Sequence, residues 1–182
     1  IWQRAIHITS DIPSEHLLIA YSDPSGLSVH RINADGTIGS EVPQPGLADA
    51  GVYAHQVRVA PSNRTVILCT RGHQAPGRPH APGALKVFDY RNVLLSGEVS
   101  VAPGGGHAFG ARHLDFHPTQ PWIYLTLESQ HQLCLFTHDG GRLSDAPLYS
   151  KPTLDDARIA ALPKQIAGDR KSTRLNSSHG YI

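Results

Sequence analysis

The stretch FHPTQPWIYLTL (116–127) decides the fold of this chain, because two earlier segments repeat its pattern. In each copy a short strand-like segment enters a turn that contains Ser or Pro, and an apolar run follows the turn. The turn segments are ITSDIPSEH (8–16), VAPSNR (59–64) and FHPTQP (116–121), and the apolar runs are LLIAY (17–21), VILCT (66–70) and WIYLTL (122–127). Aligned at Ile8, Val59 and Phe116, the copies are 51 and then 57 residues apart.

A second alternating run follows in each copy, and a turn with a weaker strand closes it. These runs are LSVHRI (27–32), LKVFDY (85–90) and QLCLFTH (132–138). Units of about four strands at a period near 40–50 residues are typical of β-propeller blades. We therefore expect an all-β fold of about three blades from a larger, incomplete ring. The expected units are roughly 5–50, 51–108 and 109–153, with the start of a further connection at 154–168.

The composition of the 182 residues agrees with a β protein that is rich in turns. Charged residues make up 17%, while Gly (17) and Pro (14) are plentiful. The formal charge of +1 gives no reason to expect a nucleic acid as partner. No apolar run approaches the roughly 20 residues of a membrane span, so we expect no membrane partner. Cys69 and Cys134 lie in apolar runs, which favours small buried side chains over a disulfide or a catalytic thiol.

The last segment, DRKSTRLNSSHGYI (169–182), has no apolar periodicity and no relation to the repeat. Its first eleven residues resemble the in-frame translation of a common sequencing-adapter oligonucleotide. We therefore expect a non-native tail, with a natural disordered terminus as the alternative. The chain also begins at Ile1 and contains no Met, so we expect both ends to be cuts. Residues 154–166 are compatible with either a short helix or an extended connection.

Blade sheets pack on both faces, so VILCT (66–70) and WIYLTL (122–127) are expected to be buried on both sides. Three blades without the rest of a ring would leave two open sheet faces. We therefore expect the isolated chain to be marginally stable or prone to aggregation.

Polar residues gather where the apolar strands of the second and third units end. In the third unit, residues whose numbers sum to about 239–240 should face each other across the hairpin, and Arg112 and Glu128 satisfy this. The same reasoning places His55 at that end of the second unit, with Arg71 nearly opposite. Adjacent blades would bring His55, Arg112 and Glu128 around one mouth of the central channel, which is a plausible active site.

Plainer interpretations stay open at these positions. An Arg–Glu pair across neighbouring strands is more often a structural ion pair than a catalytic one. His113 and His117 are four residues apart on one strand, and a metal pair is conceivable, although no third ligand has suitable spacing. The run Gly104-Gly105-Gly106 lacks a following Lys-Ser/Thr, so it indicates a turn between blades and not a phosphate loop.

Two segments, AHQVRVAPSNR (54–64) and GARHLDFHPTQPWIYLTLE (110–128), resemble the seven-bladed propeller lactonase family. That family includes propeller-type 6-phosphogluconolactonases and carboxy-muconate lactonizing enzymes. The resemblance covers residues 5–168, or three of seven blades. It implies a site of one histidine, one glutamate and two arginines, which by motif match His55, Glu128 and Arg112, with the second arginine beyond Gly168. Ala111 and Tyr53 depart from the Pro and His that members often have.

The resemblance implies a lactone hydrolase that acts on a small-molecule sugar lactone, with 6-phosphogluconolactone as the expected substrate. Glu128 or His55 would be the general base. Arg112, with His113 and Arg71, would bind the substrate's anionic group. The resemblance implies neither a metal nor an organic cofactor, and we expect a cytoplasmic location and an inactive isolated fragment. The alternatives are a lactonizing cycloisomerase and a non-catalytic propeller that binds a ligand.

Overall fold

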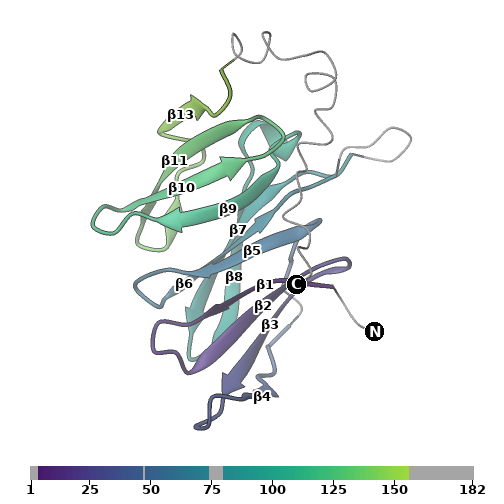
Figure 1. Ribbon diagram of the computed structural model, residues 1–182, viewed down its shortest axis with the longest axis vertical. Helices are drawn as coiled ribbons and strands as arrows, with labels where there is room; N and C mark the ends of the chain where they lie inside the picture. The colour runs from purple at the N-terminus through teal and green to yellow at the C-terminus, as the bar shows by residue number, and fades with distance from the viewer. Residues whose placement is uncertain (1–3, 47, 74–79, 156–182) are drawn as a thin grey trace, which may run out of the picture. The chain divides into compact units, whose positions relative to one another are not determined.

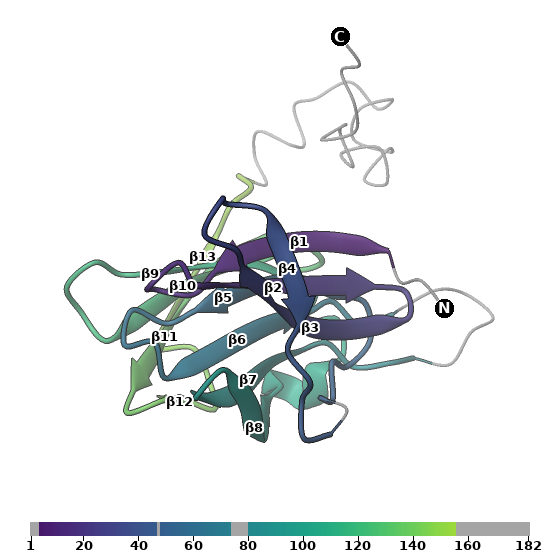
Figure 2. The ribbon, with the colours of Figure 1, turned by 90° about the horizontal axis from the view of Figure 1, so that it is seen from below.

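The computed structural model describes residues 4–46, 48–73 and 80–155, and these form three antiparallel sheets within a unit of residues 1–151 (Figure 1). In each sheet the strands follow one another in chain order, as Figure 2 shows for β5 to β8. β13 (Tyr149–Pro152) adds to the third sheet by pairing with β11. The remaining strands are β1 (Ala5–Ser10), β2 (His16–Ser22), β3 (Ser25–Ile32), β4 (Ile38–Glu41), β5 (Ala54–Val59), β6 (Thr65–Thr70), β7 (Ala84–Arg91), β8 (Leu94–Val101), β9 (Ala111–Phe116), β10 (Trp122–Leu127), β11 (Gln132–Asp139) and β12 (Arg142–Leu143).

The all-β prediction is confirmed: the described residues contain strands, turns and a single 3₁₀ turn at Pro103–Gly106. That turn lies between β8 and β9, where the glycine run was expected to connect two blades. Residues 156–182 lie outside the described part, and with them the expected tail and most of the helix-or-extended stretch. The described residues include no long apolar helix of the kind that crosses a membrane.

The first copy of the repeat begins two residues later than the sequence alignment placed it. An equivalent backbone hydrogen bond closes the first hairpin of every sheet. The N–H of Asp11 donates to the carbonyl of His16 in the first sheet, that of Ala60 to Thr65 in the second, and that of His117 to Trp122 in the third. Positions 11, 60 and 117 are therefore equivalent, and the spacing is 49 and then 57 residues. The alignment at Ile8 was wrong because it matched apolar side chains, whereas backbone pairing sets the register. Ile8 is in fact 52% exposed.

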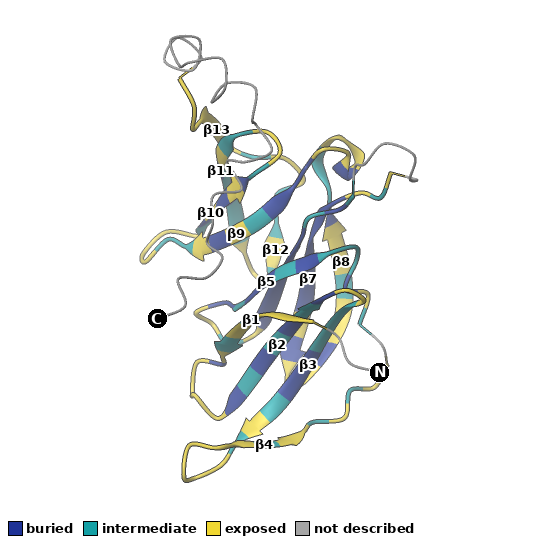
Figure 3. Cartoon of the chain, turned by 45° about the vertical axis from the view of Figure 1, so that its right-hand side comes forward, coloured by how far each residue is buried: buried dark blue, intermediate teal, exposed yellow. Residues whose placement is uncertain are grey.

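Two hydrophobic cores join the three sheets, and the middle sheet belongs to both. Val66 and Leu68 of β6 pack in the core with the first sheet, while Ile67 and Cys69 pack in the core with the third. Every residue of β6 is buried, as predicted for a blade with a neighbour on each side. The strands β4 and β13, by contrast, are mostly exposed and drawn in yellow in Figure 3.

The prediction for WIYLTL (122–127) is wrong on one face. Ile123, Leu125 and Leu127 are buried, but Tyr124 on the opposite face is 37% exposed. No sheet of the described part packs against that side of β10, so these side chains remain in contact with solvent. The expectation of an open face at the end of the array holds here, and it explains why an apolar strand shows an alternating burial pattern.

Side-chain hydrogen bonds tie the first strands of the second and third sheets together. Gln56 of β5 is buried, and its Oε1 accepts a hydrogen bond of 2.5 Å from the Leu114 backbone N–H of β9. Two residues further, Arg58 Nη2 lies 2.8 Å from Asp115 Oδ1. Both contacts cross between sheets, so they set how β5 and β9 lie against each other.

The two cysteines are free and buried, which agrees with the prediction of small apolar side chains. Burial raises the pKa of the Cys69 thiol, so this residue stays a protonated thiol at neutral pH.

Candidate active site

A β-bulge interrupts the first strand of each sheet at the same place. At each bulge, one residue of the first strand has no directly opposite partner on the second strand. These residues are Ile6 in β1, His55 in β5 and Arg112 in β9. A bulge redirects the side chain of the extra residue, and bulges recur next to functional sites. The two site residues predicted on first strands, His55 and Arg112, therefore occupy one repeated position, which only the register of the backbone identifies.

The position at the end of the second strand, its last residue in β2 and the next residue after β6 and β10, is also repeated. Its backbone N–H donates to a carbonyl just before the first strand, and the pairs are Ser22 to Arg4, Arg71 to Tyr53 and Glu128 to Gly110, at 2.9, 3.0 and 3.1 Å. Arg71 and Glu128 are thus equivalent residues of neighbouring sheets. All predicted site residues except His113 come from two repeated positions at the same end of the sheets, the end opposite the hairpins.

Gly110 allows the loop after β10 to lie against the start of β9. Its φ of 59° is in the left-handed region, and a β-carbon there would collide with the side chain of Ser129. Glu128 is consequently held across from Arg112, where Arg112 Nε lies 2.7 Å from Glu128 Oε2. The Nε–H does not meet the geometry of a linear hydrogen bond, so the contact is a close ion pair. Both side chains remain accessible, at 27% and 38% exposed.

His55 is held as a neutral imidazole. Burial is the main cause that lowers its pKa from 6.5 to about 4, and the nearby charges of Arg112, His113 and Arg71 act in the same direction. A hydrogen bond with the Arg112 backbone partly opposes them. Its Nδ1 is buried and has no hydrogen-bond partner among the described residues. At neutral pH His55 can therefore accept a proton.

The other two predicted residues lie beside this group. The ring of His113 meets the ring of His55 edge to face, with centroids 4.8 Å apart. The guanidinium of Arg71 lies over the ring of Tyr53, 5.2 Å from its centroid. The structure thus brings His55, Arg112, Glu128 and His113 together, with Arg71 near enough to influence the charge of His55.

His7 of the first sheet is a further member of this cluster that sequence reasoning missed. Burial lowers its pKa, and the charges of Arg58 and His113 contribute to this. Its Nδ1 is buried and lacks a hydrogen-bond partner within the described residues. His7 follows the bulge of β1 as His113 follows the bulge of β9. An alignment of the three copies with the corrected spacing of 49 and 57 residues would have placed His7 at the position equivalent to His113.

The idea of a metal pair at His113 and His117 does not fit the structure. His117 Nδ1 accepts hydrogen bonds from the backbone N–H groups of Thr119 and Gln120, at 3.1 and 3.0 Å. It therefore stabilises the turn between β9 and β10, at the end of the sheet away from His113. In the described ranges no three His, Cys, Asp or Glu side chains are grouped as metal ligands would be.

Mild acid should destabilise this fold through its buried and half-buried histidines. Burial lowers the folded-state pKa of His7, His55, His113 and His138, so the unfolded chain binds protons that the folded chain does not. Stability is then full above pH 6.5 and falls as the pH drops towards 4. For the partly exposed His55 we expect a loss on the order of 1 kcal/mol, or about 2–4 °C in Tm. Thermal melts from pH 7.5 to 4 test this, and His55→Gln should flatten the dependence.

The sequence of this chain matches a family model, and its fold is similar to solved structures. The family model described as "Lactonase, 7-bladed beta-propeller" matches residues 3–162. The periplasmic gluconolactonase PpgL of Pseudomonas aeruginosa is similar in structure, with a TM-score of 0.58 and 21% identity over 82% of this chain and 42% of that one. A putative 6-phosphogluconolactonase from Bacteroides uniformis has a TM-score of 0.59 and 17% identity over 80% and 41%. No curated protein matches.

Structural likeness at this level of identity shows the fold alone. A protein with a different name, the hydrazine synthase of Kuenenia stuttgartiensis, has a TM-score of 0.61 at 9% identity, over 80% of this chain and 49% of that one. Its score is as high as those of the lactonase structures, so similarity of fold does not identify the activity. The chain spans about two fifths of the length of the lactonase structures that it resembles. The family assignment rests instead on the sequence model, which covers most of the chain. The three sheets are therefore blades, and the chain belongs to the seven-bladed β-propeller lactonase family.

Proposed function

We propose that this chain forms part of a lactonase that hydrolyses a sugar lactone, with 6-phosphogluconolactone as the substrate. The observation that carries the proposal is the placement of neutral His55 beside the Arg112–Glu128 ion pair, on adjacent bulges of two blades. Family membership and the lactonase names of similar structures support the reaction class. An acceptor for a proton and a cation for an anion are the two groups that lactone hydrolysis needs.

In the proposed reaction, a water oxygen attacks the lactone carbonyl carbon. His55 Nδ1, which has no partner among the described residues, takes the proton of that water, and Glu128 is the alternative acceptor. Arg112 stabilises the negative charge on the carbonyl oxygen or binds the phosphate of the substrate. The carbonyl carbon then releases the ring oxygen, which leaves with the proton, so that one water is added and the ring opens.

The test is hydrolysis in ¹⁸O-labelled water by a complete ring that contains these three blades. We expect one labelled oxygen in the carboxylate of the product, because water supplies that atom. A cycloisomerase would convert a lactone without incorporating solvent oxygen, and that result would replace hydrolysis by isomerisation. Turnover of neither kind, in a ring shown to be folded, would favour a non-catalytic binding propeller.

The substrate is tested by comparing phosphorylated and unphosphorylated gluconolactone. If Arg112 binds phosphate, kcat/KM should be about tenfold or more higher for the phosphorylated lactone, because an arginine fork pairs with phosphate in two hydrogen bonds. Equal values would limit the proposal to sugar lactones in general.

A further inference from the structure

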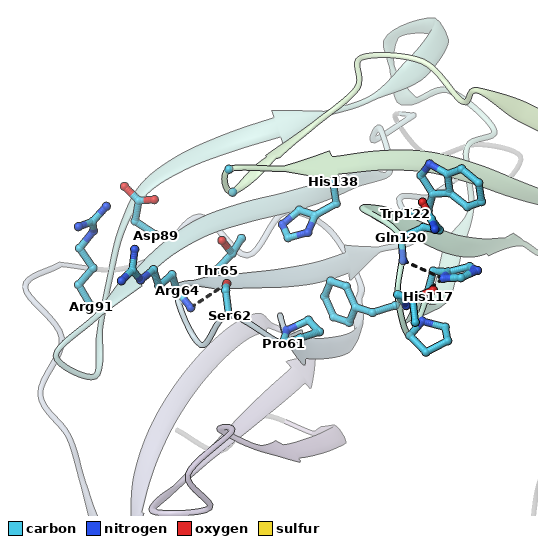
Figure 4. A pocket seen from close by; sticks show the side chains of 15 residues that line it. Pro61, Ser62, Arg64, Thr65, Asp89, Arg91, His117, Gln120, Trp122 and His138 are labelled. Atoms are coloured by element: carbon cyan, nitrogen blue, oxygen red, sulfur yellow. Dashed lines mark hydrogen bonds between the residues drawn. The ribbon is translucent and has the colours of Figure 1, made fainter.

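A groove of about 480 Å³ lies between the second and third blades, at the hairpin end of the sheets (Figure 4). Its walls come from the β5–β6 hairpin, the end of β7, the β9–β10 hairpin and the turn after β11. The candidate active site lies at the opposite ends of the same strands. Because the groove is enclosed by blades that are already neighbours here, it does not depend on any further blade.

Two arginines at one end of the groove have no partner. Arg64 and Arg91 are exposed, and neither guanidinium has an ion pair or hydrogen bond with another side chain in the part of the chain that the structure describes. The two residues are close, because Tyr90 N donates to Arg64 O at 2.9 Å and Arg91 directly follows Tyr90. Like charges that lie close together repel each other, and an anion between them would remove that repulsion.

Asp89 also lines the groove and offsets one of the two positive charges. Its carboxylate lies next to Gly97 of β8, where a β-carbon would come within 3.2 Å of Asp89 Oδ2. It forms no ion pair with a described residue. With two arginines and one aspartate, the groove carries a net positive charge.

The rest of the lining combines aromatic rings with small and polar residues, and it leaves one buried polar atom unsatisfied. Trp122 and Phe116 line the groove, and His138 packs against Phe116 with ring centroids 5.6 Å apart. His138 Nε2 is buried and has no hydrogen-bond partner among the described residues. Burial lowers the pKa of His138, although the charge of Asp139 acts against this, so the imidazole is neutral and offers a hydrogen bond without a charge.

We propose that this groove binds a small organic anion, namely a ring that carries a phosphate or a carboxylate group. Arg64 and Arg91 hold the anionic group, and the ring extends from them along the groove towards His138, which packs against Phe116 (Figure 4). The volume suits a molecule of monosaccharide size, and a few polar groups in a partly aromatic pocket are typical of small-molecule sites. The site is separate from the lactone site, so its occupancy does not depend on the proposed hydrolysis.

Trp122 lines the groove and provides a fluorescence readout of binding, and isothermal titration calorimetry with the same ligands measures binding independently of the position of Trp122. In the full 182-residue chain, Trp2→Phe leaves Trp122 as the single tryptophan, and its emission is followed during titration with glucose 6-phosphate, glucuronate or neutral glucose. We expect saturable changes with at least one of the two anions, weaker at high salt, and none with glucose up to about 10 mM. The stronger of the two anions identifies the group that the arginines prefer.

The decisive variant is Arg64→Ala/Arg91→Ala, which should raise the Kd at least about tenfold. Arg31→Ala, an exposed arginine of the first blade, is the matched control and should leave the Kd unchanged. Arg112→Ala should also leave it unchanged, because Arg112 lies at the other end of β9. Circular dichroism establishes that each variant is folded. An unchanged Kd in the double variant, loss of binding in Arg112→Ala, equal binding of glucose, or no saturation would each overturn the proposal.

Discussion

Arg112→Ala in a complete ring is expected to lower kcat/KM for the sugar lactone by about 10²–10³-fold, with kcat carrying most of the loss. The physical reason is that Arg112 acts on both candidate bases: it forms the ion pair with Glu128, and, in addition to burial, its charge lowers the pKa of His55. The fold should tolerate the change, because both partners of the ion pair are partly exposed and such pairs contribute about 1 kcal/mol or less. Steady-state kinetics with thermal melts measure both effects.

Two further variants test whether the shape and position of the Arg112 guanidinium matter, or only its positive charge. Arg112→Lys keeps the positive charge but loses the two-pronged geometry, so its activity should fall between the parent and the alanine variant. Arg31→Ala removes an exposed arginine of the first blade and should leave kcat/KM unchanged. If Arg112→Ala retains full turnover, Arg112 has no catalytic role, and the ion pair with Glu128 is structural.

Gln56→Leu is expected to destabilise the chain by about 2 kcal/mol, or about 4–8 °C in Tm, although a leucine fills a similar volume. Gln56 is buried, and its Oε1 is the acceptor for the Leu114 N–H of the neighbouring blade. Without it the buried N–H has no partner, and the cost of removing that group from water is no longer offset. Chemical or thermal unfolding of the full chain measures the change.

Arg58→Ala is the matched control for Gln56→Leu, because it removes a different polar contact between the same two strands, β5 and β9. The Arg58–Asp115 ion pair is accessible, with the aspartate 68% exposed, so its loss should cost less than about 1 kcal/mol. Equal destabilisation by the two substitutions would mean that the buried hydrogen bond contributes no more than the exposed ion pair. In a complete ring with the proposed activity, Gln56→Leu should also reduce kcat, since Gln56 follows the bulge residue His55 on the same strand.

Much of the candidate site could be predicted from the sequence because hairpins constrain residues over short distances. The pairing rule placed Arg112 opposite Glu128, and their side chains meet at 2.7 Å. The repeat placed His55 and Arg71 at the same end of the neighbouring blade, where the structure has them. Their roles in catalysis remain a proposal. What the rule missed was the bulge at Arg112, because an extra residue in a strand leaves no sign in the hydrophobic pattern.

Two other residues, His7 and His117, could not be placed from the sequence. His7 joins the cluster only through packing of the first blade against the second, and the alignment at Ile8 hid its equivalence to His113. His117 looked like a candidate ligand on the strand of His113, yet its ring nitrogen accepts two backbone hydrogen bonds within the turn. Backbone pairing sets the register that places His7, and backbone N–H groups hold the ring of His117 in the turn. The types of side chain along the sequence do not reveal either arrangement.

The sequence by itself determined the all-β fold, the repeated blade and the family, because strand periodicity, turn residues and local hairpin pairing depend on residues close in the chain. Only the tertiary structure decided the register of the first blade, the bulges at His55 and Arg112, the cross-blade bond from Leu114 to Gln56 and the basic groove near Arg64. These features depend on backbone pairing and on contacts between residues about 50 positions apart. Such contacts arise only when neighbouring sheets pack face to face.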